Sequence, residues 1–146
     1  MRISKKFEHI PVLLAEVVEY LNCRDGALVV DCTLGGGGHA AAILDKITPA
    51  GIVIGIDKDK AAIDAAKIKL AHFSQQILFV KGDFQDLGKI LKKLNIATVD
   101  GILFDLGVSS LQLDEPERGF SYRFDAPLDM RMDTETKLTA AKVVNL

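Results

Sequence analysis

The stretch from Val29 to Leu44, VVDCTLGGGGHAAAIL, joins a valine-rich run to an alanine-rich run through four consecutive glycines. The first run is typical of a buried strand, and the second is typical of a helix. Glycine at this junction permits a tight turn and lets a ligand lie directly on the main chain. Residues 35–40 fit the pattern G-x-G-x-x-G/A, and Asp57 follows twenty residues after Gly37. The stretch therefore predicts a nucleoside-binding turn at the end of a strand.

Strand-like and helix-like segments alternate along the rest of the chain. Continuous apolar runs predict four strands, at residues 27–32, 52–57 and 77–81 and within 101–107, a range that also includes the exit turn of the fourth strand. Apolar residues at helical spacing predict a helix with Pro11 in its first turn, and others over 39–47, 59–73 and 86–94. Asp59 and Asp86 are placed to cap the last two. This alternation predicts an α/β fold with a parallel sheet and helices on both faces.

Carboxylates gather where the predicted strands end. Each of the four strands ends in an acidic residue or leads into one within three positions, and these residues are Asp31, Asp57, Asp83 and Asp105. Ligands of parallel sheets bind beyond the carboxyl ends of the strands, so we expect these groups along one binding edge. Asp57 would accept hydrogen bonds from ribose hydroxyls. Asp83 and Phe84 would hold an adenine ring, or would be a loop acid and a core phenylalanine.

The charge of this edge bears on the choice of cofactor. A dinucleotide would place its pyrophosphate on the helix after the glycines, close to Asp31. S-adenosylmethionine has no phosphate and carries an ammonium and a sulfonium, which suit neighbouring carboxylates. Asp31 could instead cap local amides. A P-loop is not favoured because no Gly-Lys-Ser/Thr follows the glycines. S-adenosylmethionine is the preferred cofactor, and an NAD-dependent oxidoreductase domain is the alternative.

Length and composition limit the possible classes of protein. The 146 residues suit one domain, and an apolar content of 49% is enough to build a core. The formal net charge of −2 neither indicates nor excludes a nucleic-acid partner. Cys23 and Cys32 have no metal-site spacing, so we expect reduced thiols and no metal. The N-terminal residues fit neither a signal peptide nor a membrane span, which predicts a cytoplasmic protein.

Three further motifs make a family resemblance visible. They are HIPVLLAEVV (His9 to Val18), DLGVSSLQLD (Asp105 to Asp114) and ERGFSYRFDAPLDMRMD (Glu117 to Asp133). With the glycine stretch, they resemble the bacterial 16S ribosomal RNA cytosine-N4 methyltransferase family (RsmH/MraW type) over essentially the whole chain. The resemblance implies a class I (Rossmann-like) methyltransferase with strand order 3-2-1-4. It also implies S-adenosyl-L-methionine as cofactor and N4-methylation of a cytosine in the decoding region of 16S ribosomal RNA, free or in the assembled subunit.

The resemblance also implies the cofactor contacts. Carried over position by position, they are Gly37, Gly38, His39, Asp57, Phe84, Asp105 and Gln112. His39 could equally be a capping or packing residue, Asp105 a strand-end cap and Gln112 a solvated loop residue. The catalytic group stays unassigned because the turn after the fourth predicted strand lacks the D/S/N-P-P-Y/F pattern of many amino-methyltransferases.

The segment 118–132 interleaves arginines with aromatic residues. Aromatic side chains can stack on a splayed base, and arginines can hold phosphates. Nearby carboxylates offset this charge, so the segment could instead fold onto its own domain.

The family has an inserted helical domain and a C-terminal return to the sheet that this sequence does not include. We therefore expect residues 1–136 to be the N-terminal part of the methyltransferase domain and residues 137–146 to begin a helix, capped by Thr139, that leads toward the insertion. On this interpretation the chain is a truncated form without the C-terminal strands and is inactive in transfer by itself. The remaining alternative is a non-catalytic fragment that acts through homodimerisation or partner binding along its open sheet.

Overall fold

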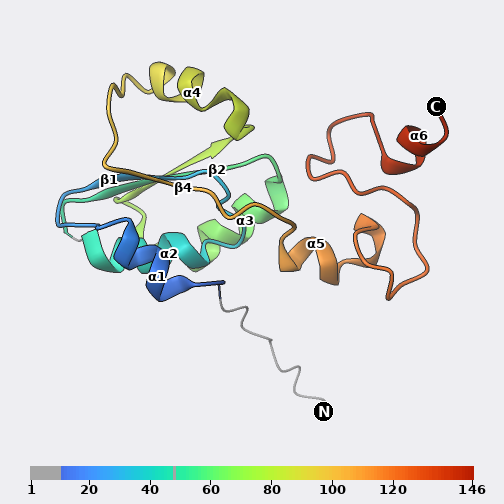
Figure 1. Cartoon of the computed structure of the whole chain (residues 1–146), viewed down its shortest axis with the longest axis horizontal. Helices are drawn as coiled ribbons and strands as arrows, with labels where there is room; N and C mark the ends of the chain where they lie inside the picture. The colour runs from blue at the N-terminus through green and yellow to red at the C-terminus, as the bar shows by residue number, and fades with distance from the viewer. Residues whose placement is uncertain (1–10, 48) are drawn as a thin grey trace, which may run out of the picture.

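A computed structural model describes residues 11–47 and 49–146, in which four strands alternate with helices (Figure 1). The elements of the sheet and its covering helices are α1 (Leu14–Tyr20), β1 (Leu28–Asp31), α2 (Gly38–Ile47), β2 (Ile52–Asp57), α3 (Lys60–Lys69), β3 (Ile77–Lys81), α4 (Leu87–Lys93) and β4 (Gly101–Leu103). The remainder contains α5 (Ser110–Asp114), α6 (Ala140–Val144) and the short 3-10 helices η1 (Ala71–Phe73), η2 (Phe84–Asp86) and η3 (Pro116–Arg118).

The sheet is wholly parallel and has the order β3-β2-β1-β4, which confirms the predicted order. Strands β2 and β3 span the predicted residues, and β4 ends at Leu103, within the range predicted for the fourth strand and its exit turn. The backbone N–H of Asp105 donates to the hydroxyl of Thr33, at 2.7 Å, so the chain leaves the ladder soon after Leu103. This contact brings the ends of β1 and β4 together at the carboxyl edge.

Helices cover both faces of the sheet, as predicted. Figure 1 shows α1, α2 and α3 on one side and α4 on the other. The larger core packs α2 and α3 on the sheet and includes Val29, Ile43, Leu44, Val53, Ile63, Ala66 and Leu70. The smaller core packs α4 on Val30, Cys32, Ile54 and Ile56. In the neighbouring strands, Ile102 pairs with Val30 and Leu78 pairs with Ile54. Both side chains are 41% exposed, so α4 covers only the middle of this face of the sheet.

Of the helix starts predicted at Pro11, Asp59, Asp86 and Thr139, the last three are correct in position, although Asp86 lacks the predicted cap hydrogen bond. Asp59 caps α3 by accepting from the N–H of Ala61, at 3.0 Å, and Thr139 caps α6 in the same way. Asp86 precedes α4 but makes no cap hydrogen bond, because its carboxylate pairs with Lys89, at 2.6 Å. Pro11 is not in the first turn of α1. The helix begins at Leu14, because Leu13 has a left-handed backbone with φ 50°.

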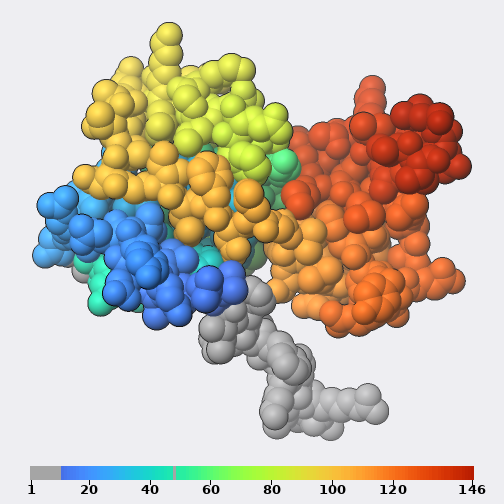
Figure 2. Space-filling model, viewed as in Figure 1, coloured from blue at the N-terminus to red at the C-terminus, as the bar shows by residue number. Residues whose placement is uncertain are grey.

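The chain after β4 forms a separate group of loops and short helices beside the carboxyl edge of the sheet (Figure 2). Its last helix is tied down by backbone hydrogen bonds from Ala140 to Asp129 and from Ala141 to Leu128. The boundary at residue 136 stays a prediction. Among the described residues, no helix has the length and hydropathy needed to cross a membrane.

Candidate functional site

The glycine turn connects β1 to α2, and its glycines serve different purposes. Gly37 has φ +77°, and a Cβ there would lie 2.9 Å from the side chain of Leu70 in α3. A Cβ on Gly38 would lie 2.3 Å from the ring of Pro11. Gly36 is exposed and a Cβ there would meet nothing within 4 Å. Packing within the chain thus requires glycine at two positions, and Gly36 leaves bare backbone open for a ligand.

His39, in the first turn of α2, is buried between two segments. Its Nε2 lies 2.9 Å from the carbonyl oxygen of Val12, and its Nδ1 lies 3.8 Å from a carboxylate oxygen of Asp105. The packing role considered for this histidine is therefore present. Its predicted cofactor contact stays a prediction.

Asp57, the last residue of β2, joins the strand end to the glycine turn. One carboxylate oxygen accepts from the backbone N–H of Gly35, at 2.8 Å, and the other accepts from that of Asp59, at 2.9 Å. Burial raises the pKa of Asp57, and these hydrogen bonds partly oppose the shift. Each oxygen has further lone pairs, so the carboxylate can hold the turn and still accept from ribose hydroxyls.

Asp31, the last residue of β1, is 1% exposed. Its Oδ1 accepts from the N–H of Thr33, at 3.1 Å, whereas its Oδ2 has no hydrogen-bond partner among the described residues. Burial raises the pKa of Asp31 to about 6, while His39 lowers it and the carboxylates of Asp57 and Asp105 raise it. Asp57 and Asp105 thus lie close enough to Asp31 to act on its carboxylate, which brings together three of the four predicted strand-end acids.

Asp83 and Phe84 follow β3 and lie beside Lys58. Asp83 accepts from the N–H of Gln85, at 2.9 Å, and from the ammonium of Lys58, at 2.8 Å, and both contacts lower its pKa. The ring of Phe84 packs against the smaller core and meets Phe104 edge-on, with centroids 5.6 Å apart. Phe84 is therefore at least partly a core residue, as the alternative interpretation held.

Gln112, in α5, is buried and hydrogen-bonded within the chain. Its amide nitrogen donates to Oδ2 of Asp59, at 3.0 Å, and its amide oxygen accepts from the N–H of Ser109, at 3.0 Å. The alternative of a solvated loop residue is wrong. Its predicted cofactor contact stays a prediction. In this structure Gln112 binds Asp59, whose backbone N–H donates to Asp57 at the end of β2.

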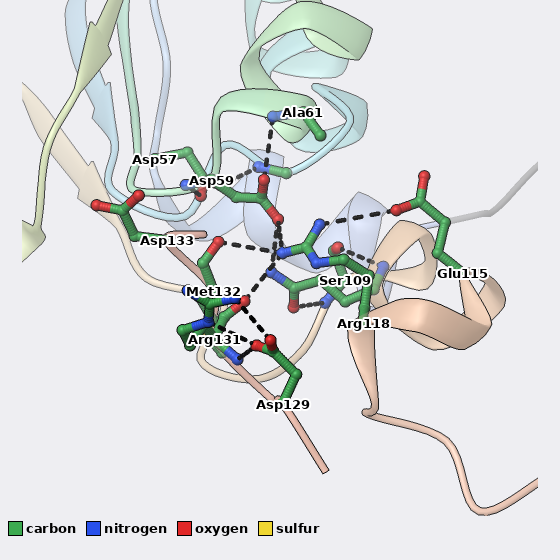
Figure 3. Close-up of polar contacts among 12 residues, drawn as sticks. Asp57, Asp59, Ala61, Ser109, Glu115, Arg118, Asp129, Arg131, Met132 and Asp133 are labelled. Carbon is green, nitrogen blue, oxygen red and sulfur yellow. Dashed lines mark hydrogen bonds and ion pairs between the residues drawn. The ribbon is translucent and has the colours of Figure 1, made fainter. Parts of the chain in front are cut away.

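The arginines of the segment 118–132 divide into two groups. Arg118 binds Asp59 and Arg131 binds Asp129, each across 2.7 Å (Figure 3). Arg123 and the wholly exposed Tyr122 remain at the surface. Sequence reasoning missed the pairing of Arg118 with Asp59, because Asp59 was already explained as a helix cap and no local pattern links the two residues.

A cavity of about 480 Å³ opens beside these strand ends. Its lining includes Lys58, Lys81, Asp83, Arg131 and Asp133. Its charges pair with one another or with neighbours, since Lys58 binds Asp83 and Lys81 lies 3.4 Å from Asp133. Within residues 11–47 and 49–146, no group of three or more His, Cys, Asp or Glu side chains is arranged to hold a metal ion.

The parallel sheet of order β3-β2-β1-β4 with helices on both faces is a Rossmann-like methyltransferase fold, and solved structures share it. A candidate rRNA methylase from Clostridium thermocellum aligns with a TM-score of 0.59 at 25% identity, over 69% of this chain and 54% of that chain. An rRNA methylase from Streptococcus thermophilus aligns with a TM-score of 0.55 at 18% identity, over 68% and 57%. Fibrillarin from Aeropyrum pernix, solved with bound S-adenosyl-L-methionine, has a TM-score of 0.51 at 20% identity, over 66% and 37%.

The chain belongs to the MraW methylase family, whose model matches residues 6–146. Ribosomal RNA small subunit methyltransferase H from Desulfosudis oleivorans is 52% identical to it over 139 residues, which are 95% of this chain and 45% of that protein. The chain thus spans less than half the length of this relative. The resemblance and the fold class predicted from the sequence are confirmed.

Proposed function

We propose that this chain is the cofactor-binding part of an S-adenosyl-L-methionine-dependent methyltransferase that modifies a cytosine at N4 in the decoding region of small-subunit ribosomal RNA. Membership of a methylase family supports the reaction class. The name of the relative, a small-subunit ribosomal RNA methyltransferase, supports the substrate class. A ribosomal RNA substrate would place the enzyme in the cytoplasm.

The observation that carries the cofactor assignment is the buried Asp31. Its Oδ2 lacks a partner among the described residues, and two further carboxylates act on it. Burying a polar atom without a partner costs free energy of folding, and a cation beside the Asp31 carboxylate would compensate its negative charge and lower that cost. An ammonium or sulfonium group beside the glycine turn fits this edge. The pyrophosphate of a dinucleotide does not, which is why an NAD-dependent oxidoreductase domain remains the weaker alternative.

The chain offers a group for each part of such a cofactor. Asp57 would accept from the ribose hydroxyls, and the bare backbone at Gly36 would allow close approach. Asp83 and Phe84 would border the adenine ring. Asp105, whose side chain is 43% exposed, lies at the open side of the edge. When bound, S-adenosyl-L-methionine supplies an activated methyl group.

The substrate amine sets the remaining demands on the site. The lone pair of the cytosine exocyclic nitrogen is delocalised into the ring, so the site must orient this lone pair and accept a proton from the nitrogen. Holding two reactants in line can lower a barrier by about 7–11 kcal/mol. Positioning is therefore the main contribution that we assign to this fold, and we name no catalytic base.

One structural observation favours a second candidate function. Beyond β4, Phe104, Leu106 and Val108 are 47%, 70% and 46% exposed, next to the half-exposed Ile102. A second copy or another partner would cover these apolar side chains, which lie in and just after the edge strand β4. In that case the chain would be a non-catalytic binding module or a homodimer.

Methyl transfer tests the proposal. Small ribosomal subunits would be incubated with the chain and S-adenosyl-L-methionine labelled in the methyl group, and the RNA would then be digested to nucleosides. Label in N4-methylcytidine supports the proposed reaction, and label in another nucleoside contradicts it. Absence of transfer by a chain that still binds the cofactor is the result expected of a cofactor-binding part that does not act alone, whereas absence of both transfer and cofactor binding would favour the binding module.

A further inference from the structure

Arg118 and Asp59 form a buried ion pair that joins two distant segments. The Nη2 atom of Arg118 lies 2.7 Å from Oδ2 of Asp59, and the two side chains are 8% and 3% exposed (Figure 3). The same oxygen accepts from Gln112, and the other oxygen of Asp59 accepts from the N–H of Ala61. Removing one partner of a buried pair leaves an uncompensated charge, so the arrangement of these groups is strongly fixed.

On one side, the pair reaches the strand end that carries the proposed ribose acceptor. The backbone N–H of Asp59 donates to Asp57, at 2.9 Å, and Asp57 in turn accepts from Gly35, at 2.8 Å. A continuous series of polar contacts thus runs from Arg118 to the glycine turn. Any displacement of Asp59 would change the orientation of the Asp57 carboxylate.

On the other side, Arg118 holds the segment 129–133. Its Nη2 lies 3.1 Å from the carbonyl oxygens of Arg131 and Met132, and its own carbonyl oxygen accepts from the N–H of Met130, at 3.0 Å. This segment lines the cavity beside Lys58 and Asp83. Figure 3 shows the guanidinium of Arg118 between Asp59 and these carbonyl groups.

We propose that Arg118 is a positioning residue that couples cofactor binding to the ordering of the segment 129–133. Its guanidinium binds Asp59, whose backbone N–H donates to Asp57, so Arg118 acts on the proposed ribose acceptor through Asp59. The same contacts that orient the ribose acceptor also hold the segment, so each arrangement stabilises the other. The inference rests on the proposed function, because it takes the adenosine-binding edge as its starting point.

The test uses affinity and hydrogen exchange in addition to stability, since any buried arginine affects stability. S-adenosyl-L-homocysteine would be titrated calorimetrically into the wild-type chain, Arg118→Leu and Arg118→Lys, well below each unfolding midpoint. We expect Arg118→Leu to bind roughly tenfold more weakly, within the usual range of coupling between sites, and Arg118→Lys to be intermediate. Arg123→Leu, which changes an exposed arginine in the same segment, is the matched control and should bind like the wild type.

Hydrogen exchange distinguishes a coupling role from a purely structural one, because a purely structural role would not alter the effect of the ligand on amide protection. Saturating S-adenosyl-L-homocysteine should increase protection of amides 129–133 in the wild type and in Arg123→Leu, and it should leave them unchanged in Arg118→Leu. A folded Arg118 variant with the same affinity as the wild type and the same increase in protection on ligand binding would overturn the inference. If Arg118→Leu does not fold, Arg118→Lys carries the same comparison. Failure of the wild-type chain to bind at all would contradict the proposed function instead.

Discussion

The carboxylate of Asp57 accepts a hydrogen bond from the backbone N–H of Gly35, at 2.8 Å. The last residue of β2 therefore fixes the turn that follows β1, although the two residues lie 22 positions apart. A residue predicted to bind ribose also shapes the loop on which the cofactor would lie. Structural and binding roles coincide here, so each substitution needs separate measurements of stability and affinity.

Replacing Asp57 by alanine should impair both roles. The backbone N–H groups of Gly35 and Asp59 would lose their acceptor, which should lower the free energy of unfolding by about 1–3 kcal/mol. Affinity for S-adenosyl-L-homocysteine should fall by roughly 10- to 100-fold, the value of a hydrogen bond to a charged group. Urea unfolding and calorimetry measure the two effects. Asp45→Ala, at an exposed position of α2, is the control, and a folded Asp57→Ala chain with unchanged affinity would exclude the ribose role.

Asp31 should make stability depend on pH in an unusual direction. Its pKa is raised from 3.8 to about 6 in the folded chain, so the folded state holds this proton more tightly than the unfolded state. The contribution of Asp31 to stability is therefore present below about pH 4 and is lost as the pH rises through 6. A shift of this size corresponds to at most about 3 kcal/mol.

Asp31→Asn isolates this effect, because asparagine keeps an acceptor for Thr33 and cannot ionise. The stability of the variant relative to the wild type should increase between pH 4 and pH 8, while its affinity for S-adenosyl-L-methionine should fall. Urea unfolding at both pH values checks the first part and calorimetry the second. A pH-independent difference in stability would show that Asp31 does not titrate as described.

Replacing Gly36 or Gly38 by alanine should affect stability differently. Gly38→Ala would place a methyl group against Pro11 and should cost about 1–3 kcal/mol of stability, as overpacking does. Gly36→Ala has open space and should change stability by no more than about 0.5 kcal/mol. Only Gly36→Ala tests ligand approach cleanly, and we expect it to weaken cofactor binding. Thermal unfolding of the two variants, followed by titration of Gly36→Ala, makes the comparison, and equal loss of stability in both would contradict it.

Thr33 should position Asp105 by accepting from its backbone N–H. Thr33→Val keeps the shape and removes the acceptor, so the free energy of unfolding should fall by about 1 kcal/mol and cofactor affinity should fall with it. Thr33→Ser retains the hydroxyl and should restore affinity. If the Thr33→Val and Thr33→Ser variants have the same cofactor affinity, the hydrogen bond between Asp105 and the hydroxyl of Thr33 has no part in cofactor binding.

Local patterns were sufficient for most of the fold. Strands β2 and β3 match their predicted ranges, because each is an apolar run with clear boundaries. The sequence also predicted that Asp31, Asp57, Asp83 and Asp105 share one edge, since parallel strands end together, and Asp57 and Asp105 do act on Asp31. The sheet order followed from the family resemblance rather than from periodicity.

Long-range contacts account for what was missed. The sequence did not predict which residue ends β4, because the chain leaves the sheet where Asp105 contacts Thr33, which lies 72 positions away. The link between Arg118 and Asp59 spans 59 positions, and an aspartate that already explains a helix cap gives no sign of a second, buried partner. Gln112 looked like a loop residue for the same reason, because its burial depends on Asp59.

The central claim is that the edge formed by the glycine turn and the strand-end carboxylates binds S-adenosyl-L-methionine. Parallel calorimetric titrations of the chain with S-adenosyl-L-methionine and with NAD⁺ test it most directly. We predict saturable binding of S-adenosyl-L-methionine at one site per chain and no binding of NAD⁺. A folded chain that binds NAD⁺ in preference, or that binds neither compound, would contradict the claim.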